Sequence, residues 1–173
     1  TTTGNWPVKS PGGAVTLNMQ THGTDVGMTH TGTGAARLNP AATSGQLGTL
    51  IVENLPTAKF DASVDFANLP SAGSIRFGVN TGAGSAVLLY GAGNAEAYLT
   101  ASSWAKQGST LSKVLAAGTL RIVYDGVNVT WYLGSDQVAQ SALTATRESV
   151  NVAVGAYFNA AGVTFSNLKL SAL

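Results

Sequence analysis

Apolar residues alternate with polar residues along several stretches of this chain, and this two-residue period constrains the fold more than any other feature. The clearest stretches are residues 59–67, 74–80 and 150–158. Their apolar sets are Phe60, Ala62, Val64 and Phe66; Ile75, Phe77 and Val79; and Val150, Val152, Val154, Ala156 and Phe158. A β-strand with one buried face has this period, because successive side chains point to opposite faces. Turn-forming clusters of Gly, Pro, Asn and Ser recur about every ten residues, which is typical of sandwiches and barrels, so the sequence predicts an all-β chain.

Residues 119–134 predict a well-defined hairpin. Asp125-Gly126 suits a two-residue type I′ turn, because both central positions of that turn need positive φ. The turn fixes the register and places six residues on one core-facing side, in the pairs Tyr124–Val127, Ile122–Val129 and Leu120–Trp131. The opposite side receives Arg121, Val123, Asn128, Thr130 and Tyr132.

Residues 163–173 change phase within one predicted strand. Val163 and Phe165 share one parity, whereas Leu168 and Leu170 share the other. A β-bulge near Ser166-Asn167 would bring both sets onto a common face.

The composition limits the classes of function. Only 10% of the 173 residues are charged, against about 25% in typical soluble proteins. Hydroxyl and amide residues replace them, as on extracellular and virion β-proteins, so we expect an extracellular or virion-surface location. The net charge is +1 and the basic residues are scattered singly, so no nucleic-acid partner is expected. No apolar run is long enough for membrane insertion, and the absence of Cys excludes thiol catalysis and disulfides.

The length fits one domain over residues 1–173, and four of its segments share a recognisable arrangement. They are a Trp followed by a glycine turn and an apolar strand, a pair of sheet strands, a hairpin, and two closing strands, at residues 4–17, 60–79, 120–133 and 154–170. Together they resemble the concanavalin A-like jelly roll of legume lectins, laminin G-like modules and several glucanases. The resemblance covers most of the chain and implies an antiparallel two-sheet β-sandwich. It bears on fold more than on function.

A second resemblance concerns residues 2–8, Thr-Thr-Gly-Asn-Trp-Pro-Val. They are similar to a Thr/Gly-Asn-Trp-Pro segment that recurs in bacteriophage tail-fibre proteins. The Gly-, Thr-, Ala- and Asn-rich composition also resembles the distal domains of such fibres. This resemblance implies a homotrimeric, host-recognising tip.

The acidic and metal-ligating residues offer little catalytic chemistry. Asp61 and Asp65 share the outward face of one predicted strand, but four residues on a strand span roughly 13 Å, more than the ~5–9.5 Å between glycosidase carboxylates. No catalytic residue is therefore expected. His22, Asp25 and His30 lie in a polar stretch without a zinc-ligand spacing, so no metal is expected there. Lectin-like jelly rolls often bind calcium, but no dense Asp/Asn loop supports a calcium site, and no cofactor is predicted.

Trp104 points most directly to a ligand. It lies in the polar segment Ser103-Trp104-Ala105-Lys106-Gln107, which has no clear alternation. An exposed Trp offers a sugar ring an apolar surface, and the side chains of Ser103, Lys106 and Gln107 would bind the sugar hydroxyls. The alternative is a loop Trp folded over the edge of the sandwich.

Three further residues are candidates for a subunit interface. Val123, Tyr132 and Tyr157 face outward by parity. Apolar side chains on an otherwise polar face mark association surfaces.

These observations favour a non-catalytic module that binds a cell-surface glycan or receptor, as the distal domain of a phage fibre or spike. The first alternative is a structural virion component, a decoration or fibre module, that acts through assembly. The second alternative is a polysaccharide-active enzyme that uses Asp61 or Asp65.

Overall fold

The alternating segments are β-strands in the computed structural model of this protein. The structure describes residues 5–10, 13–22, 28–30, 35–38, 44–51, 59–80, 84–100, 103–143, 151–158, 160 and 162–173, with side chains for 59–80, 84–100, 103–143, 152, 154–156, 160, 162–171 and 173. Every secondary-structure element in these ranges is a strand, which confirms the all-β prediction. The strands are β1 (Asn5–Ser10), β2 (Gly13–His22), β3 (Met28–His30), β4 (Ala35–Leu38), β5 (Ser44–Ile51), β6 (Phe60–Ala67), β7 (Ser74–Asn80), β8 (Ser85–Gly91), β9 (Asn94–Thr100), β10 (Trp104–Ser112), β11 (Gly118–Tyr124), β12 (Asn128–Leu133), β13 (Asp136–Ala142), β14 (Asn151–Phe158) and β15 (Thr164–Ala172).

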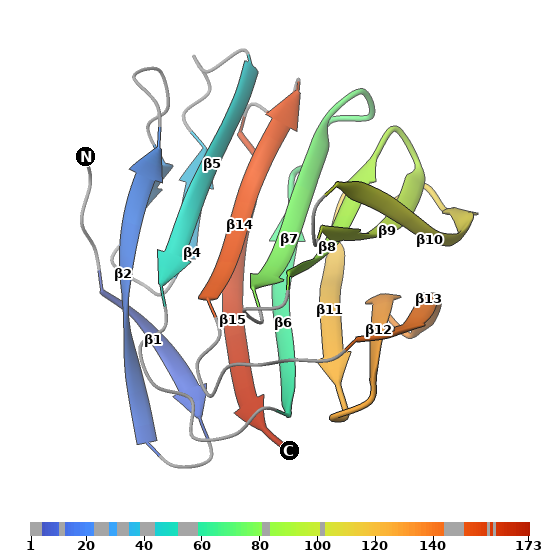
Figure 1. The fold of residues 1–173 in the computed structure, drawn as a ribbon. Coiled ribbons are helices and arrows are strands. Elements are labelled where there is room, and N and C mark those ends of the chain that lie inside the picture. Colours follow the sequence, from blue (N-terminus) through green and yellow to red (C-terminus); the bar gives the residue numbers. More distant parts are fainter. Residues whose placement is uncertain are drawn as a thin grey trace.

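The strands follow one hydrogen-bonded path that folds back on itself into a sandwich. The order is β10-β9-β8-β7-β14-β5-β2-β1-β15-β6-β11-β12-β13, with β4 on β15 and β3 on β4. Figure 1 shows the path turning at β2 and β1, so that β14 and β7 lie in front of β15 and β6. All strand pairings among the described residues are antiparallel except that of β1 with β15. The architecture is therefore the predicted antiparallel two-sheet β-sandwich.

The core lies between the two layers and follows the predicted alternation. The apolar sets of β6 and β7 are all fully buried, as are Val152 and Val154 of β14. The largest fully buried side chains are Trp131, Tyr90, Phe60, Phe66, Phe77 and Phe165. Burial of each such side chain stabilises the fold by roughly 1.5–3 kcal/mol. Val150 lies outside the described residues, and the side chain of Phe158 is not described.

The predicted bulge in the last strand is confirmed. The register of β15 against β6 shifts between Ser166 and Lys169, and Asn167 has a φ of 50°. As a result Phe165, Leu168 and Leu170 are all buried.

The predicted register of the β11–β12 hairpin is wrong by two residues. Tyr124 pairs with Val129, Ile122 with Trp131 and Leu120 with Leu133. The carboxylate of Asp125 explains the longer loop, because its Oδ1 accepts the backbone N–H groups of Val127 at 2.8 Å and Asn128 at 2.7 Å.

The shift preserves the face of each strand residue, because it equals one full period of the strand. Leu120, Ile122, Tyr124, Val129 and Trp131 are buried as predicted. Val127 is instead 65% exposed in the loop, and Leu133 is buried in its place. Thr130, which was predicted to face outward, is instead buried, with 6% of its surface exposed.

A tight turn joins β8 to β9. Gly91 pairs with Asn94, and the two residues between them have positive φ, 48° for Ala92 and 76° for Gly93. This is the geometry of a type I′ turn, which matches the twist of the flanking strands. The turn sets the register of β9 and therefore of the polar face described below.

The two ends of the hydrogen-bonded path, β10 and β13, approach each other. A Cβ on Gly108 of β10 would lie 3.2 Å from the Cβ of Ala139 in β13. Lys113, just after β10, forms an ion pair with Asp136 of β13, with Nζ and Oδ2 2.6 Å apart. Among the described residues no helix is long and apolar enough to cross a membrane.

Candidate functional site

The outer face of β7, β8, β9 and β10 carries a ladder of polar and aromatic side chains. On β9 the small apolar residues Ala95 and Ala97 are buried, so the residues between them point outward. Strand pairing aligns the outward residues in rows. The rows are Asn80–Ser85–Thr100–Trp104, Gly78–Val87–Tyr98–Lys106, Arg76–Leu89–Glu96 and Ser74–Gly91–Asn94–Ser112.

Trp104 is the first residue of β10, not a loop residue, and it is 51% exposed. Its ring lies edge-on to Tyr98, with centroids 5.5 Å apart, and the guanidinium carbon of Arg76 lies 5.7 Å from its centroid. Arg76 is on β7, three strand spacings or about 14 Å from β10 in a flat sheet. Both side chains must therefore extend along the sheet, which holds the indole over the outer face.

Four side chains beside Trp104 form a closed hydrogen-bond cluster. Glu96 Oε1 accepts from Lys106 Nζ at 2.7 Å and from Thr110 Oγ1 at 2.9 Å, and Glu96 Oε2 accepts from the Tyr98 hydroxyl at 2.7 Å. These bonds, that from Lys106 foremost, lower the pKa of Glu96 to about 2. The same carboxylate raises the pKa of Tyr98. Glu96 is therefore ionised at neutral pH, and its charge is balanced by Lys106.

A bulge in β10 brings Thr110 into this cluster. The register against β9 shifts between Gln107 and Leu111, and Gly108 within the bulge has a φ of 66°. The two extra residues keep the parity of the strand. Thr110 therefore points to the same face as Lys106, and Lys106 Nζ lies 2.5 Å from its hydroxyl oxygen.

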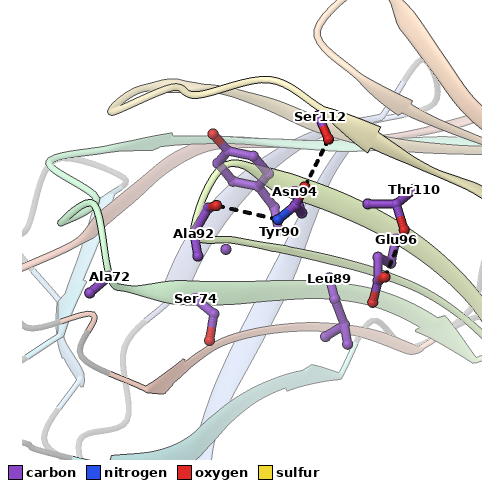
Figure 2. A pocket seen from close by; sticks show the side chains of 10 residues that line it. Ala72, Ser74, Leu89, Tyr90, Ala92, Asn94, Glu96, Thr110 and Ser112 are labelled. Atoms are coloured by element: carbon purple, nitrogen blue, oxygen red, sulfur yellow. Dashed lines mark hydrogen bonds between the residues drawn. The ribbon is translucent and has the colours of Figure 1, made fainter.

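A groove of about 640 Å³ continues the face beyond this cluster. Figure 2 shows Leu89 between Ser74 on one side and Glu96 and Thr110 on the other. At the far end Ser112 Oγ donates to Asn94 Oδ1 at 3.0 Å. The lining is Ala72, Ser74, Leu89, Tyr90, Gly91, Ala92, Asn94, Glu96, Thr110 and Ser112. The groove therefore combines an apolar floor with hydroxyl, amide and carboxylate groups.

Solved structures share this architecture over nearly the whole chain. A carbohydrate binding module, CBM66, from Bacillus subtilis has a TM-score of 0.64 at 12% identity, over 95% of this chain and 99% of that chain. The fold is a lectin-like jelly roll. A protein of unknown function with a galectin-like fold, also from Bacillus subtilis, has a TM-score of 0.61 at 7% identity, over 89% of this chain and 88% of that one.

The jelly roll also occurs within a longer chain. The binding domain of botulinum neurotoxin serotype D has a TM-score of 0.58 at 12% identity; the match covers 98% of this chain and 47% of that one. No family model matches the sequence, and no curated protein matches it either. At these identities the likeness shows the fold alone.

The jelly roll separates the four predicted ligand residues. Trp104 and Lys106 lie on the outer face, and Ser103 is exposed just before β10. Gln107 pairs with the buried Ala97, so it points to the opposite face, and its Nε2 donates to the Ala105 carbonyl at 2.8 Å. The ligand role of all four stays a prediction.

Sequence reasoning missed most of the residues that surround Trp104. Arg76 lies on β7, and Tyr98 and Glu96 lie on β9, as does Asn94 at the far end of the groove. The signal was present in Asn94–Thr100, where Asn, Glu, Tyr and Thr alternate with Ala, Ala and Leu. This alternation predicts a polar outer face, but not which strand lies beside it.

The acidic residues singled out in the sequence lie on the other sheet and are engaged there. Arg121 holds Asp61 with two bonds, Nε to Oδ1 at 2.8 Å and Nη2 to Oδ2 at 2.7 Å. Asp65 accepts from Thr119 Oγ1 at 2.6 Å and from Asn167 Nδ2 at 2.9 Å. Both carboxylates are therefore held by neighbouring side chains.

The predicted interface residues are only partly described. Val123 and Tyr132 are partly exposed on the outer face of β11 and β12, and Arg121 lies 5.2 Å from the Tyr132 ring centroid. The side chain of Tyr157 lies outside the described residues. The side chains of His22 and His30, and all of Asp25, are likewise outside them. Among the described side chains, no three His, Asp or Glu residues group as metal ligands.

The described lining of the groove has polar groups for a ligand but not the pair of carboxyl groups that acid–base hydrolysis of a glycoside uses. Glu96 is the single carboxylate among its lining residues, and its pKa of about 2 makes it a weak base. A glycosidase needs two carboxyl groups, one of them protonated near neutral pH. What this face offers is an aromatic surface, an apolar floor and fixed hydrogen-bonding groups.

Proposed function

We propose that this jelly roll is a non-catalytic carbohydrate-binding module, and that its sugar site is the outer face of β7 to β10. One observation carries the proposal: Trp104 is 51% exposed, yet Arg76 and Tyr98 hold its ring in place beside the groove. A large aromatic side chain that is both exposed and fixed provides a stacking surface at low entropic cost.

The chemistry of a sugar matches this surface. A pyranose has an apolar C–H face and a rim of hydroxyls. The indole of Trp104 suits the first, and the polar groups of the same face, such as Lys106, suit the second. Binding sites of this kind combine apolar walls with a few placed polar groups.

The shared fold supports the same reading. One structure with this fold is described as a carbohydrate binding module and another as a neurotoxin binding domain. Both names describe recognition, and neither describes catalysis. Because a fold hosts many functions, the proposal rests on the site and not on these names.

The finer part of the proposal is that the glycan or receptor is on a bacterial cell surface and that the module lies at the tip of a phage fibre or spike. Residues 2–8 and the charge-poor composition support it. It places the module on a virion surface or outside the cell, in a homotrimer.

Assembly in a virion is the second candidate function. The partly exposed Val123 and Tyr132, on the sheet opposite to the groove, favour it.

Binding of the purified chain to an array of bacterial surface polysaccharides tests the carbohydrate proposal. The array compares the native chain with Trp104→Ala and with Val127→Ala, a control that shortens another exposed apolar side chain. We expect specific binding that Trp104→Ala weakens at least tenfold, about 1.4 kcal/mol, and that Val127→Ala leaves unchanged. Equal binding by Trp104→Ala, or no binding at all, overturns the proposal.

Light scattering tests the second candidate function, assembly, by measuring the mass of the native chain and of Tyr132→Ala. A native chain that is monomeric at all concentrations contradicts assembly.

A further inference from the structure

We infer that the sugar site has two separated subsites along β9 and therefore selects an extended oligosaccharide. The inference rests on the proposed function and goes beyond it, because a stacking Trp alone would serve a single sugar. One subsite is the Trp104 platform, and the other is the polar end of the groove at Asn94, Ser112 and Ser74.

The two subsites lie at opposite ends of one strand. Trp104 pairs with Thr100, the last residue of β9, and Ser112 pairs with Asn94, the first. Thr100 lies six positions after Asn94, so the backbones of the two ends are roughly 20 Å apart. The Trp104 ring packs against Tyr98, which is four positions, or roughly 13 Å of strand, from Asn94. A single pyranose ring is much shorter, so one ring cannot contact both subsites. A chain of several rings lying along β9 can.

The polar end is equipped to bind hydroxyls. Ser112 Oγ donates to Asn94 Oδ1 at 3.0 Å, which fixes the Asn94 amide. Asn94 Nδ2 donates to the Ala92 carbonyl at 3.4 Å, so its second N–H is available. The hydroxyl of Ser74, on the facing wall, has no hydrogen-bond partner among the described residues. Leu89 lies between these walls and gives the sugar an apolar floor.

Gly91 keeps this end open. It lies between Ser74 and Asn94 in the same row. A Cβ on Gly91 would be 2.3 Å from the Cβ of Ser74. Any larger residue at position 91 would therefore fill the floor of the second subsite.

The charges between the subsites are balanced within the face. Glu96 and Lys106 neutralise each other across 2.7 Å, and all the bonds to the carboxylate are made inside the cluster. The polar end carries hydroxyl and amide groups. These groups can bind sugar hydroxyls, while the further cation of the face, Arg76, lies at the Trp104 ring.

The length dependence of binding tests this inference. The polysaccharide that binds best in the array is partially hydrolysed and separated into chains of one to six units. Affinity is measured by calorimetry for the native chain, Trp104→Ala, Asn94→Ala and, as a matched control, Gln137→Ala. Gln137 is an exposed amide on β13. Thermal unfolding of each variant checks that it is folded.

We expect affinity to rise at least tenfold between one unit and four. Asn94→Ala should weaken the four-unit chain about fivefold or more and leave the monosaccharide unchanged, whereas Trp104→Ala should weaken both. A monosaccharide that binds as tightly as the longer chains, or an Asn94→Ala variant that binds four units normally, overturns the inference while the proposed function stands. If no polysaccharide binds, the proposed function fails and this inference with it.

Discussion

Tyr90 and Leu115 are joined by a short hydrogen bond: the backbone N–H of Leu115 donates to the Tyr90 hydroxyl at 2.6 Å. The hydroxyl in turn lies 2.9 Å from the carbonyl oxygen of Lys113 and 3.1 Å from that of Leu115. Tyr90 is 1% exposed on β8, and Leu115 follows β10. One buried hydroxyl therefore ties the chain beyond the edge strand to the core beneath the groove.

Removal of this hydroxyl should destabilise the protein. Tyr90→Phe leaves the Leu115 N–H and two carbonyls without this partner, and we expect a loss of about 1–3 kcal/mol in the free energy of unfolding. Urea denaturation measures it. Tyr132→Phe is the control, because the Tyr132 hydroxyl has no hydrogen bond within the described part of the chain. Equal losses for both variants would show that the Tyr90 bonds contribute nothing.

Two substitutions of Trp131 should differ in how much they lower the free energy of unfolding. Trp131 is fully buried, and its Nε1 has no hydrogen-bond partner among the described residues. Trp131→Ala should cost about 3–5 kcal/mol through the cavity that it leaves. Trp131→Phe should cost much less, because it also removes an unpaired buried N–H. Calorimetric unfolding separates the two; similar large losses would mean that the N–H is satisfied in solution.

The Glu96 cluster predicts a pH dependence of stability. The pKa of Glu96 in the folded protein is about 2, below the ordinary value of 4.5, so folding favours the ionised carboxylate. The contribution to stability is therefore fully present above pH 4.5 and is lost as the pH falls toward 2.

Glu96→Gln removes this contribution, so the variant should be less stable at neutral pH and should approach the native protein in stability near pH 2. Urea titrations at several pH values provide the comparison. Parallel curves for the two proteins across this range would contradict the assigned ionisation.

Two glycines on neighbouring strands should differ sharply in their tolerance of alanine. A Cβ on Gly91 meets Ser74 Cβ at 2.3 Å and its Cα at 2.8 Å, whereas one on Gly78 has its nearest contact at 3.5 Å with Val87. Gly91→Ala should destabilise by about 1–3 kcal/mol, and Gly78→Ala by much less. Adding Ser74→Gly should restore only part of the loss. Thermal unfolding of the three variants and the native chain tests this, and an unchanged Gly91→Ala protein would contradict the close approach.

The two-residue period predicted which residues form the core but not how the strands are aligned. Leu120, Ile122 and Trp131 are buried although their predicted pairing is wrong, because a shift of two residues leaves every side chain on its face. The error arose in the loop. The residue types of Asp125-Gly126 fit a two-residue turn, but the Asp125 carboxylate accepts two backbone N–H groups and so stabilises a longer loop.

The candidate site could be predicted only where one residue carried the signal. Trp104 stands out in a polar segment, and its exposure agrees with that reading. The partners of Trp104 could not be predicted in this way. Arg76 reaches the indole from β7, which is not adjacent to β10, and no local sequence pattern indicates a contact between such distant strands. Gln107 was predicted beside Trp104 by sequence proximity, but strand alternation turns it to the other face.

The approach of β10 to β13 has a consequence for solubility. An uncovered strand at the margin of a sheet offers its backbone N–H and C=O groups to any extended peptide and so invites fibril growth. Here both margins of the path face each other, with Gly108 against Ala139 and the Lys113–Asp136 ion pair across the gap. The contact at these residues leaves less room beside either strand for an incoming peptide. A charge-poor chain has little electrostatic repulsion to keep its copies apart, and this mutual shielding protects it from aggregation by geometry instead.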